Sequence, residues 1–309
     1  MDVLIQQIIN GLVLGSMYAL VALGYTMVYG IINLINFAHG EVLMVGALTS
    51  WSVMTYGAEA LPQVAPGWLF AVSLLISCLV CAGLNYLIEK VAYRPLRNAP
   101  KLAPLITAIG LSILLQTLAM IIWKPNYKSY VSPLSSVPID VFGAVISPTQ
   151  VMILALTALL LVALMVLVNT TKLGRAMRAT SESAAMASLM GVKPDQVISV
   201  TFVIGAVLAG VAGVMWAANF GTVHHAMGFL PGLKAFTAAV LGGIGNLPGA
   251  VVGGLCLGLI ESIGSGYLGE LSGGVLGSQY SDIFAFMVLI LMLTLRPSGL
   301  LGEKLAERA

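Results

Sequence analysis

Charge is scarce in this chain of 309 residues: only 8% are Asp, Glu, Lys or Arg, against about 25% in typical soluble proteins. Hydrophobic residues supply 59% of the sequence, and the mean hydropathy is +1.00. The alternating ten-residue pattern of a membrane β-barrel is also missing. We therefore expect an all-α, polytopic helical membrane protein with about eight transmembrane segments, one or more of them broken or re-entrant. Four windows lack any charge and match or exceed the roughly 20 residues of a membrane-spanning helix, namely residues 3–40, 102–123, 141–171 and 196–233.

Motifs for nucleotide, metal or catalytic sites are absent as well. No Gly-x-x-x-x-Gly-Lys-Ser/Thr phosphate loop occurs, and the glycine run at Gly242–Gly245 follows no strand, so it is not a dinucleotide fingerprint. His224 and His225 have no Glu or Cys at metal-ligand spacing, which favours interfacial histidines over a metal site. We expect no metal, no cofactor and no enzymatic activity in this chain.

Only three cysteines are present, Cys78, Cys81 and Cys256, and all lie in apolar segments. The one-turn spacing of the first two is compatible with a redox or zinc pair, but no second pair or histidine accompanies them. Buried, inert thiols are the favoured interpretation. The net charge of +2 does not indicate nucleic-acid binding, because membrane topology explains where the basic residues lie.

One polar stretch, Gly30–Val42, interrupts the hydrocarbon of the N-terminal region. Glu41 carries the only charge of residues 3–58, and charged residues within membrane segments usually face a bundle interior or a pathway. We expect a break between two membrane helices whose polar groups face inward; a short cytoplasmic turn is the alternative. A buried carboxylate needs a partner, and the imidazole and amides nearby in the sequence are candidates. The residues predicted to line or adjoin a substrate path are Asn33, Asn36, Phe37, His39 and Glu41.

Further spans follow from the apolar runs and from the prolines and basic residues that separate them. Residues 124–148 read as an extramembrane loop with little regular structure. The glycine-rich region 233–268 contains either full spans or re-entrant half-helices around a turn at Gly245–Gly249. The predicted segments are Gln6–Tyr29, Ile35–Met54, Trp68–Ile88, Leu102–Trp123, Thr149–Val168, Val197–Asn219, Leu233–Ile244, Ala250–Ile263 and Ile283–Leu295.

Basic residues gather on one side of this arrangement. Eleven of the fourteen Lys and Arg residues fall in the loop 90–101, the segment 172–193 and the tail from residue 296. Because short loops rich in Lys and Arg stay in the cytoplasm, we expect a multi-pass membrane protein with its N-terminus outside the cytoplasm and its C-terminus in the cytoplasm. The acidic start does not match a signal peptide, so the first span is expected to be retained.

Small residues recur at every fourth position in two later segments. Such stripes let helix backbones approach closely in lipid. Static packing and movement of the helices against one another, or against a partner, both stay open as interpretations. The residues assigned to helix packing are Gly245, Gly249 and Gly253, and a second series in the preceding span comprises Gly205, Ala209 and Gly213.

The basic loop at about 171–195 contains a segment with the composition of a short helix. Ser181 or Ser183 is suited to cap it, its Ala/Met/Leu body favours a helix of about two turns, and Gly191 before a Lys-Pro pair ends it. A short helix with small and methionine side chains on its surface suits docking into a partner's groove. A helix lying on lipid headgroups is the alternative.

A more specific signal comes from stretches that together span nearly the whole chain. Through them the sequence resembles the inner-membrane permease subunits of branched-chain amino acid ABC transporters. The motifs at Asn36–Gly40 and Lys234–Ala238 are specific to this group, and the match is weakest at residues 124–148 and around His224. The matching stretches are Tyr25-Thr-Met-Val-Tyr-Gly-Ile-Ile, Ile35-Asn-Phe-Ala-His-Gly-Glu-Val, Val91-Ala-Tyr-Arg-Pro, Met186-Ala-Ser-Leu-Met-Gly-Val, Thr201-Phe-Val-Ile-Gly-Ala and Gly232-Leu-Lys-Ala-Phe-Thr-Ala-Ala-Val-Leu-Gly-Gly-Ile-Gly-Asn-Leu-Pro-Gly-Ala.

The resemblance implies a permease that forms the translocation path for leucine, isoleucine and valine. Its partners would be a second permease of the same family, two cytoplasmic ATP-binding subunits, a periplasmic amino-acid-binding protein and membrane lipid. It also implies one transmembrane permease domain, residues 1–309, with a cytoplasmic coupling segment at about 171–195. The residues assigned to ATPase coupling are Glu182, Ala184, Ala185, Met186, Leu189 and Gly191.

Two other functions stay open at this point. Related permeases with the same architecture import urea or short-chain amides, and the sequence alone does not fix the solute. An ion-coupled secondary transporter or channel is the alternative from another class. Paired broken segments in inverted repeats would then be expected, and only one such segment is clear.

Overall fold

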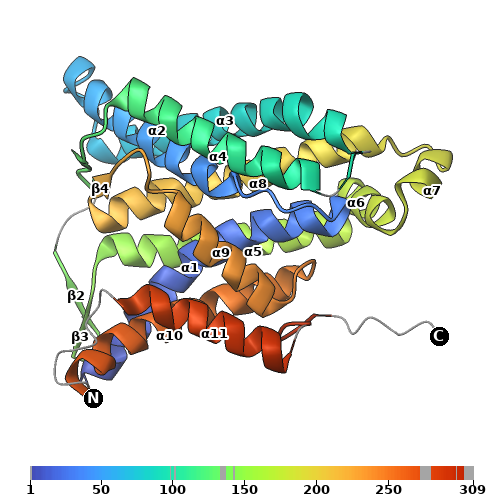
Figure 1. The fold of residues 1–309 in the computed structure, drawn as a ribbon. Helices are drawn as coiled ribbons and strands as arrows, with labels where there is room; N and C mark the ends of the chain where they lie inside the picture. The colour runs from blue at the N-terminus through green and yellow to red at the C-terminus, as the bar shows by residue number, and fades with distance from the viewer. Residues whose placement is uncertain are drawn as a thin grey trace.

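The structure, a computed structural model, describes residues 2–97, 99–100, 102–132, 137–141, 143–271, 280–296 and 298–302. Most of these residues are helical, as the long apolar runs predict (Figure 1). The elements in chain order are α1 (Asp2–Ile32), α2 (His39–Ala60), α3 (Pro66–Ile88), the π-helical turn η1 (Glu89–Tyr93), the 3-10 turn η2 (Arg94–Leu96), α4 (Leu102–Trp123), β1 (Lys128–Ser129), β2 (Ile139–Val141), β3 (Ala144–Ile146), α5 (Pro148–Thr170), α6 (Lys172–Glu182), α7 (Ala184–Leu189), α8 (Pro194–Phe220), β4 (Thr222–Val223), α9 (Phe229–Gly242), α10 (Leu247–Leu271) and α11 (Ser281–Leu295).

Six helices among the described residues are long and apolar enough to cross a membrane: α1, α3, α4, α5, α8 and α10. Helix α2 has 22 residues and a more polar composition, whereas α9 and α11 have 14 and 15 residues. At about 1.5 Å per residue, α9 is roughly 21 Å long, well short of a hydrocarbon core of about 30 Å. The chain is therefore a polytopic helical membrane protein, and its region 233–268 combines a helix too short to span the hydrocarbon core with one long enough to span it.

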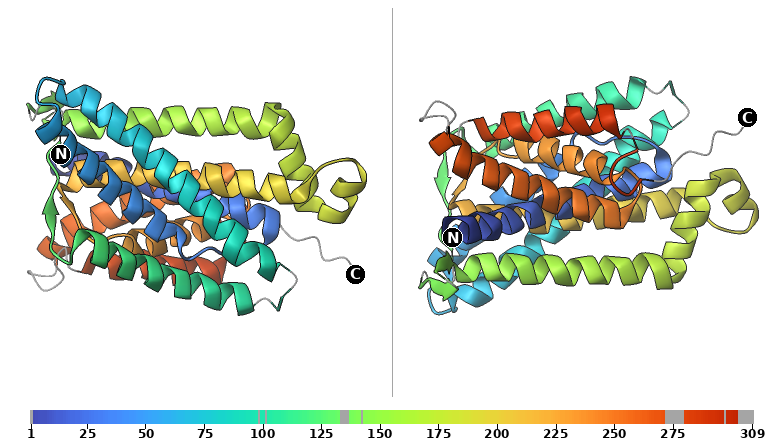
Figure 2. Two further views of the ribbon diagram at one scale, coloured as in Figure 1. Left: turned by 90° about the horizontal axis from the view of Figure 1, so that it is seen from above. Right: turned by 90° about the horizontal axis from the view of Figure 1, so that it is seen from below.

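The helices run roughly side by side, so the molecule has two distinct ends. Helices α1 and α8 are mostly buried, whereas α4 and α5 lie at the periphery. The strands lie at the end that carries the N-terminus, where β1 pairs with β4 and β2 pairs with β3, both antiparallel (Figure 1). Helices α6 and α7 project from the opposite end (Figure 2). This separation places any contact made through α7 far from any contact made through the strands.

The most extensive contact in the bundle joins α1 to α10, and glycines form it. A Cβ added at Gly258 would overlap the backbone of Gly15, and one added at Gly254 would lie 2.7 Å from the Cα of Ala19. The two backbones therefore touch, which small residues permit in membrane helices. The glycine series extends to α1, where Gly11 meets the backbone of Leu259.

The glycines assigned to helix packing divide into two roles. Gly249 and Gly253 face α9, where an added Cβ would overlap the backbone at Gly242 and Ala238. Gly245 does not belong to this stripe, so that part of the assignment is wrong. It lies in the turn before α10 with a φ of 96°, and an added Cβ would meet nothing within 4 Å. Gly245 is required for its left-handed backbone rather than for close packing.

Helix α2 begins inside the bundle, and not at its edge. Residues 33–38 are non-helical, and α2 starts at His39, whose ring lies against Gly24 of α1. Gly24 precedes the end of α1 by about 12 Å along the helix axis. Gly40 also contacts Gly228 and Gly232, so the first turns of α2 and α9 meet in the interior. The predicted break between two membrane helices is present, and α9 supplies a second helix that starts within the bundle.

The segment between α5 and α8 contains two helices where the sequence predicted one. Helix α6 begins after Thr171, whose hydroxyl accepts a hydrogen bond from the N–H of Gly174 (3.1 Å). Helix α7 begins after Ser183, whose hydroxyl accepts from Met186 (3.3 Å), so of the two candidate caps Ser183 is the one used. Ser183 has an extended backbone, which breaks the helix.

Candidate functional site

The non-helical segment between α1 and α2 is held by one of its asparagines. The side-chain oxygen of the buried Asn36 accepts hydrogen bonds from the N–H of Ala38 (3.1 Å) and from the hydroxyl of Tyr93 (2.8 Å). Asn side chains commonly stabilise turns in this way. Asn33 lies at the surface and ends α1 with a φ of 51°. Asn36 therefore anchors the break to η1, and Asn33 supplies only the left-handed backbone that stops the helix.

Phe37 and His39 belong to an aromatic cluster that joins α1, α2 and α9. The buried ring of His39 packs edge-on against Tyr25, with 4.9 Å between the ring centroids. The ring of Phe37 lies 5.5 Å from that of Phe236. The Nε2 atom of His39 has no hydrogen-bond partner in the described part of the chain. The cluster fixes where the two interior helix starts lie.

Glu41 is 1% exposed, and α4 holds it. One carboxylate oxygen accepts hydrogen bonds from the hydroxyl of Ser112 (3.0 Å) and the amide of Gln116 (2.7 Å). The other oxygen has no partner among the described residues and lies close to Gly228, at the start of α9. The carboxylate thus lies where α2, α4 and α9 meet.

The partners expected for Glu41 from the sequence, His39, Asn33 and Asn36, are wrong. Because α2 is helical from His39 onward, His39 and Glu41 are two residues apart and point to different faces. The side-chain nitrogen of Asn36, the atom that would donate to a carboxylate, has no hydrogen-bond partner among the described residues, and Asn33 is at the surface. Neutral groups from a distant helix replace these candidates.

A second polar centre joins α1, α9, α10 and α11, and sequence reasoning did not identify it. The ammonium group of Lys234 in α9 pairs with a carboxylate oxygen of Glu261 in α10 (2.6 Å) and with Asp282 in α11 (2.5 Å). The other oxygen of Glu261 accepts a hydrogen bond from the hydroxyl of Tyr18 in α1 (3.0 Å). Lys234 and Glu261 are 6% and 7% exposed. The only sequence signal was that both charges fall in otherwise apolar helices.

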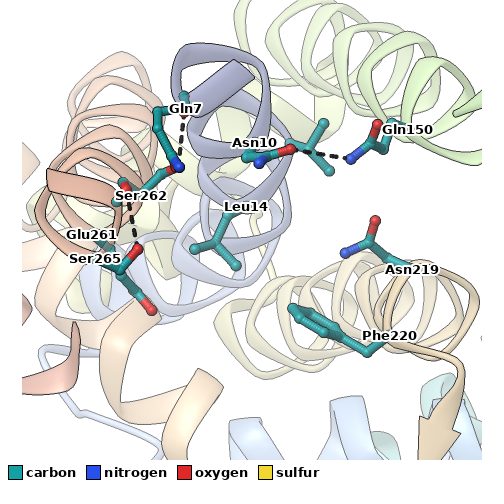
Figure 3. A pocket seen from close by; sticks show the side chains of 11 residues that line it. Gln7, Asn10, Leu14, Gln150, Asn219, Phe220, Glu261, Ser262 and Ser265 are labelled. Atoms are coloured by element: carbon teal, nitrogen blue, oxygen red, sulfur yellow. Dashed lines mark hydrogen bonds between the residues drawn. The ribbon is translucent and has the colours of Figure 1, made fainter. Parts of the chain in front are cut away.

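Two cavities adjoin Glu261. The outer one, about 460 Å³, lies between α1, α5, α8 and α10, and six of its eleven lining residues carry an amide or hydroxyl side chain (Figure 3). The deeper one, about 380 Å³, includes Tyr18, Trp216 and Lys234. Leu14, Phe220 and Glu261 line both cavities, so the carboxylate stands at their junction. None of the five residues predicted for the substrate path lines either cavity.

The loop after β4 closes the deeper cavity on one side. His224 lines this cavity, accepts a hydrogen bond from the N–H of Ala226 (3.2 Å) and packs on Tyr127. Burial, with a smaller contribution from neighbouring His225, lowers the pKa of His224 below its usual value. The ring is therefore neutral at pH 7, consistent with an interfacial histidine. Met227 also lines the cavity, while the next residue, Gly228, meets Gly40 and Glu41.

The end opposite the strands presents the short helix α7 to its surroundings. Met186, Leu189 and Met190 are 64%, 80% and 85% exposed, whereas Ala187 is buried. Gly191 follows with a φ of 84°, which suits glycine and ends the helix. Glu182 is the last residue of α6 and lies outside α7. The predicted short helix is confirmed, but its body begins at Ala184.

A network of ion pairs at the same end connects the turn after α3 to the first turn of α8. Arg97 pairs with both Glu89 and Asp195, and Arg94 pairs with Asp195 (2.9 Å). Glu89 has no exposed surface and also accepts a hydrogen bond from Ser199 (2.6 Å). The network therefore ties the first turn of α8, which follows α7 in the chain, to the turn after α3.

Comparison with known proteins bears on the whole chain. Residues 7–293 match the family model described as branched-chain amino acid transport system, permease component. The high-affinity branched-chain amino acid transport system permease protein BraD of Pseudomonas aeruginosa is 44% identical over 308 residues, which cover 98% of this chain and 97% of that protein.

Two further relatives carry similar names. The high-affinity branched-chain amino acid transport system permease protein LivH of Escherichia coli strain K12 is 42% identical over 318 aligned residues, covering 98% of this chain and 97% of that protein. The probable branched-chain amino acid transport permease protein LivH of Methanocaldococcus jannaschii is 27% identical, covering 95% and 91%. The similarity therefore extends over nearly the full length of the chain and of these relatives.

Proposed function

Since this chain belongs to the permease-component family of branched-chain amino acid transport systems, we propose that it forms the translocation path for leucine, isoleucine and valine in an ATP-binding-cassette importer. In this proposal residues 1–309 act as one permease domain, and ATP hydrolysis is supplied by partner subunits. The sequence contains no phosphate loop that could bind ATP, which agrees with this division of labour.

The observation that carries the coupling part of the proposal is the exposure of α7. A group of large apolar side chains exposed at one place on a protein usually marks a site where a partner binds. Three such side chains are exposed on α7: Met186 and Leu189 lie within its six residues, and Met190 is the C-cap. Flexible methionines suit an interface that has to keep contact during movement. We assign α7 and Gly191 to docking in a groove of an ATP-binding subunit, with Ala184 and Ala185 giving the small surface that lets it approach.

Orientation and partners follow from the same assignment. The end with α7 faces the cytoplasm of the bacterial inner membrane, and the end with the strands faces the periplasm, where a binding protein delivers the amino acid. A second permease of the same family forms the other half of the path. Asn36, Phe37, His39 and Glu41 lie beside the path in this scheme, because the first turn of α9 separates Glu41 from the deeper cavity.

Uptake of labelled leucine tests the function directly. A bacterial strain that carries the complete transporter should lose uptake when this chain is deleted and recover it when the chain is restored, with isoleucine and valine competing. Recovery of urea or acetamide uptake without leucine uptake would contradict the substrate assignment.

Thiol labelling tests the orientation. A cysteine introduced at Ser181 in α6 should react with membrane-impermeant reagents only from the cytoplasmic side. A cysteine introduced at Ser132, near the strands, should react only from the periplasmic side. The reverse pattern would overturn the assignment made from Lys and Arg.

A further inference from the structure

The polar centre at Glu261 carries one more negative than positive charge. Among the described residues Lys234 contributes the one positive charge, and the buried Glu261 and the 40% exposed Asp282 contribute two negative charges in their ionised forms. Charges inside a membrane protein are costly and usually mark a path or a binding site. Each oxygen of Glu261 accepts one hydrogen bond here, from Lys234 or Tyr18, although a carboxylate oxygen accommodates about two. An additional cation beside Glu261 would therefore be both neutralised and hydrogen-bonded.

The outer cavity offers complementary surfaces for the rest of a zwitterion. Its polar wall consists of neutral side chains, including the amides of Asn10, Gln150 and Asn219 (Figure 3). The Asn219 amide forms no side-chain hydrogen bond among the described residues, which leaves its donors available to a carboxylate. Leu14 and Phe220 supply an apolar wall beside Glu261. The cavity volume of about 460 Å³ falls within the range of about 300–1,000 Å³ that is usual for small-molecule sites.

We propose that the outer cavity is the binding site through which an aliphatic α-amino acid enters this subunit. The α-ammonium group binds the carboxylate of Glu261, the α-carboxylate binds the amide of Asn219, and the aliphatic side chain packs on Leu14 and Phe220. The site rests on the proposed function, because it assumes that the chain carries an amino acid. Lys234 and Tyr18 are positioning residues that hold the Glu261 side chain at the junction with the deeper cavity.

The position of the site fits an entry point. Asn10 lies in the first part of α1, Gln150 in the first turn of α5 and Asn219 in the last turn of α8. All three lie toward the end of the bundle that carries the strands, the side from which an importer receives its substrate. From Glu261 the deeper cavity leads toward the start of α9, so a solute released by Glu261 has polar groups of Lys234 and Tyr18 ahead of it.

The test uses the complete transporter with Glu261→Gln and Asn219→Leu. Glu261→Gln removes the charge but keeps an oxygen that accepts from Tyr18, and Lys234 retains Asp282 as its counter-ion. We expect normal assembly, with leucine uptake per assembled complex reduced about tenfold or more for Glu261→Gln and several-fold for Asn219→Leu. Thr117→Val, on the exposed face of α4, is the matched control and should leave uptake unchanged.

A labelling experiment separates substrate binding from a purely structural ion pair. In the variant Asn219→Cys, a cationic methanethiosulfonate reagent should react several-fold faster than an anionic reagent of similar size. Leucine-loaded binding protein with ATP should slow both reactions, and Glu261→Gln should remove the preference for the cation. Full uptake in Glu261→Gln, or labelling that shows neither charge preference nor protection, would overturn the site. If Glu261→Gln fails to assemble, protection of Asn219→Cys by leucine-loaded binding protein decides whether the site exists. Absence of leucine uptake in the unmodified transporter would instead count against the proposed function.

Discussion

Gln116, in α4, donates a hydrogen bond of 2.7 Å from its side-chain amide to the carboxylate of Glu41 at the start of α2. The contact joins a peripheral helix to the interior point where α2 and α9 begin. Ser112, one turn earlier in α4, donates to the same carboxylate oxygen (3.0 Å). A carboxylate held by neutral donors behaves differently from one in an ion pair, because its removal leaves no uncompensated charge behind.

The first prediction concerns this contact. Glu41→Gln should keep the assembly stable, since an amide oxygen still accepts from Gln116, but should alter transport. Glu41→Leu should cost about 1–3 kcal/mol, because it leaves the donors of Ser112 and Gln116 unpaired. That is less than the roughly 3–5 kcal/mol lost when one partner of a buried ion pair is removed.

A double-mutant cycle with Gln116→Leu measures the coupling, using thermal unfolding of the purified assembly and leucine uptake in parallel. Glu41→Leu combined with Gln116→Leu should recover part of the lost stability. Normal uptake and normal subunit levels for Glu41→Gln and for Glu41→Leu would remove Glu41 from the path region.

The second prediction concerns the α1–α10 contact. Gly258→Ala should destabilise the protein by about 1–3 kcal/mol or prevent assembly, because the added methyl group meets the backbone of Gly15 and Gly11, which cannot move aside. Gly110→Ala, in α4, is the matched control. An added Cβ there meets nothing within 4 Å, so the change should be neutral or stabilise by up to about 1 kcal/mol. Equal thermal stability of the two variants would show that α1 and α10 do not touch in the membrane.

The positions of most helices followed from the sequence, since lack of charge and flanking prolines mark where a membrane helix begins and ends. The predicted segment Leu102–Trp123 coincides with α4, and Thr149–Val168 lies within α5. The predicted start of the second span, at residue 35, was early because an apolar run does not reveal a backbone that folds back non-helically. Helix α9 shows the opposite error, because it starts at Phe229, four residues before its predicted start.

The candidate site was less accessible to sequence reasoning, and the reason is long-range pairing. Glu41 was identified because it is a lone charge in hydrocarbon, but its partners Ser112 and Gln116 look unremarkable in an apolar helix. The pairing of Lys234 with Glu261 depends on how α9 folds back onto α10. Motif reasoning could place Lys234 near the membrane, but it could not supply the distance to a carboxylate in another helix.

The third prediction concerns the ion pairs after α3. Arg97→Met should destabilise the protein by about 3–5 kcal/mol, because among the described residues it leaves the fully buried Glu89 with only the hydroxyl of Ser199 as a partner. Arg94→Met removes the pair between Arg94 and Asp195, whose side chains are 38% and 58% exposed, and should cost about 0–1 kcal/mol. Subunit levels and thermal unfolding check both variants. A larger loss for Arg94→Met than for Arg97→Met would contradict the assignment of Arg97 as the central cation.

The last prediction concerns α7. Leu189→Asp and Met186→Asp place a charge on the exposed apolar surface, so they should leave membrane insertion intact but reduce co-purification of the ATP-binding subunits and leucine uptake by about tenfold or more, as expected for central interface residues. Gly191→Pro should have the same effect for a different reason, because proline cannot adopt the φ of 84° that ends the helix. Glu182→Arg, which reverses the charge at the end of α6, should also abolish uptake while leaving membrane insertion intact. Ser188→Ala is the matched control, since the Ser188 hydroxyl bonds only to the carbonyl of Ala185 among the described residues, and both co-purification and uptake should persist.

The purified chain alone should hydrolyse no ATP, with or without these changes. Unchanged co-purification and uptake in Leu189→Asp, Met186→Asp and Gly191→Pro would mean that α7 contacts lipid headgroups or solvent, and the coupling role would have to be sought elsewhere on the end of the bundle that carries α6.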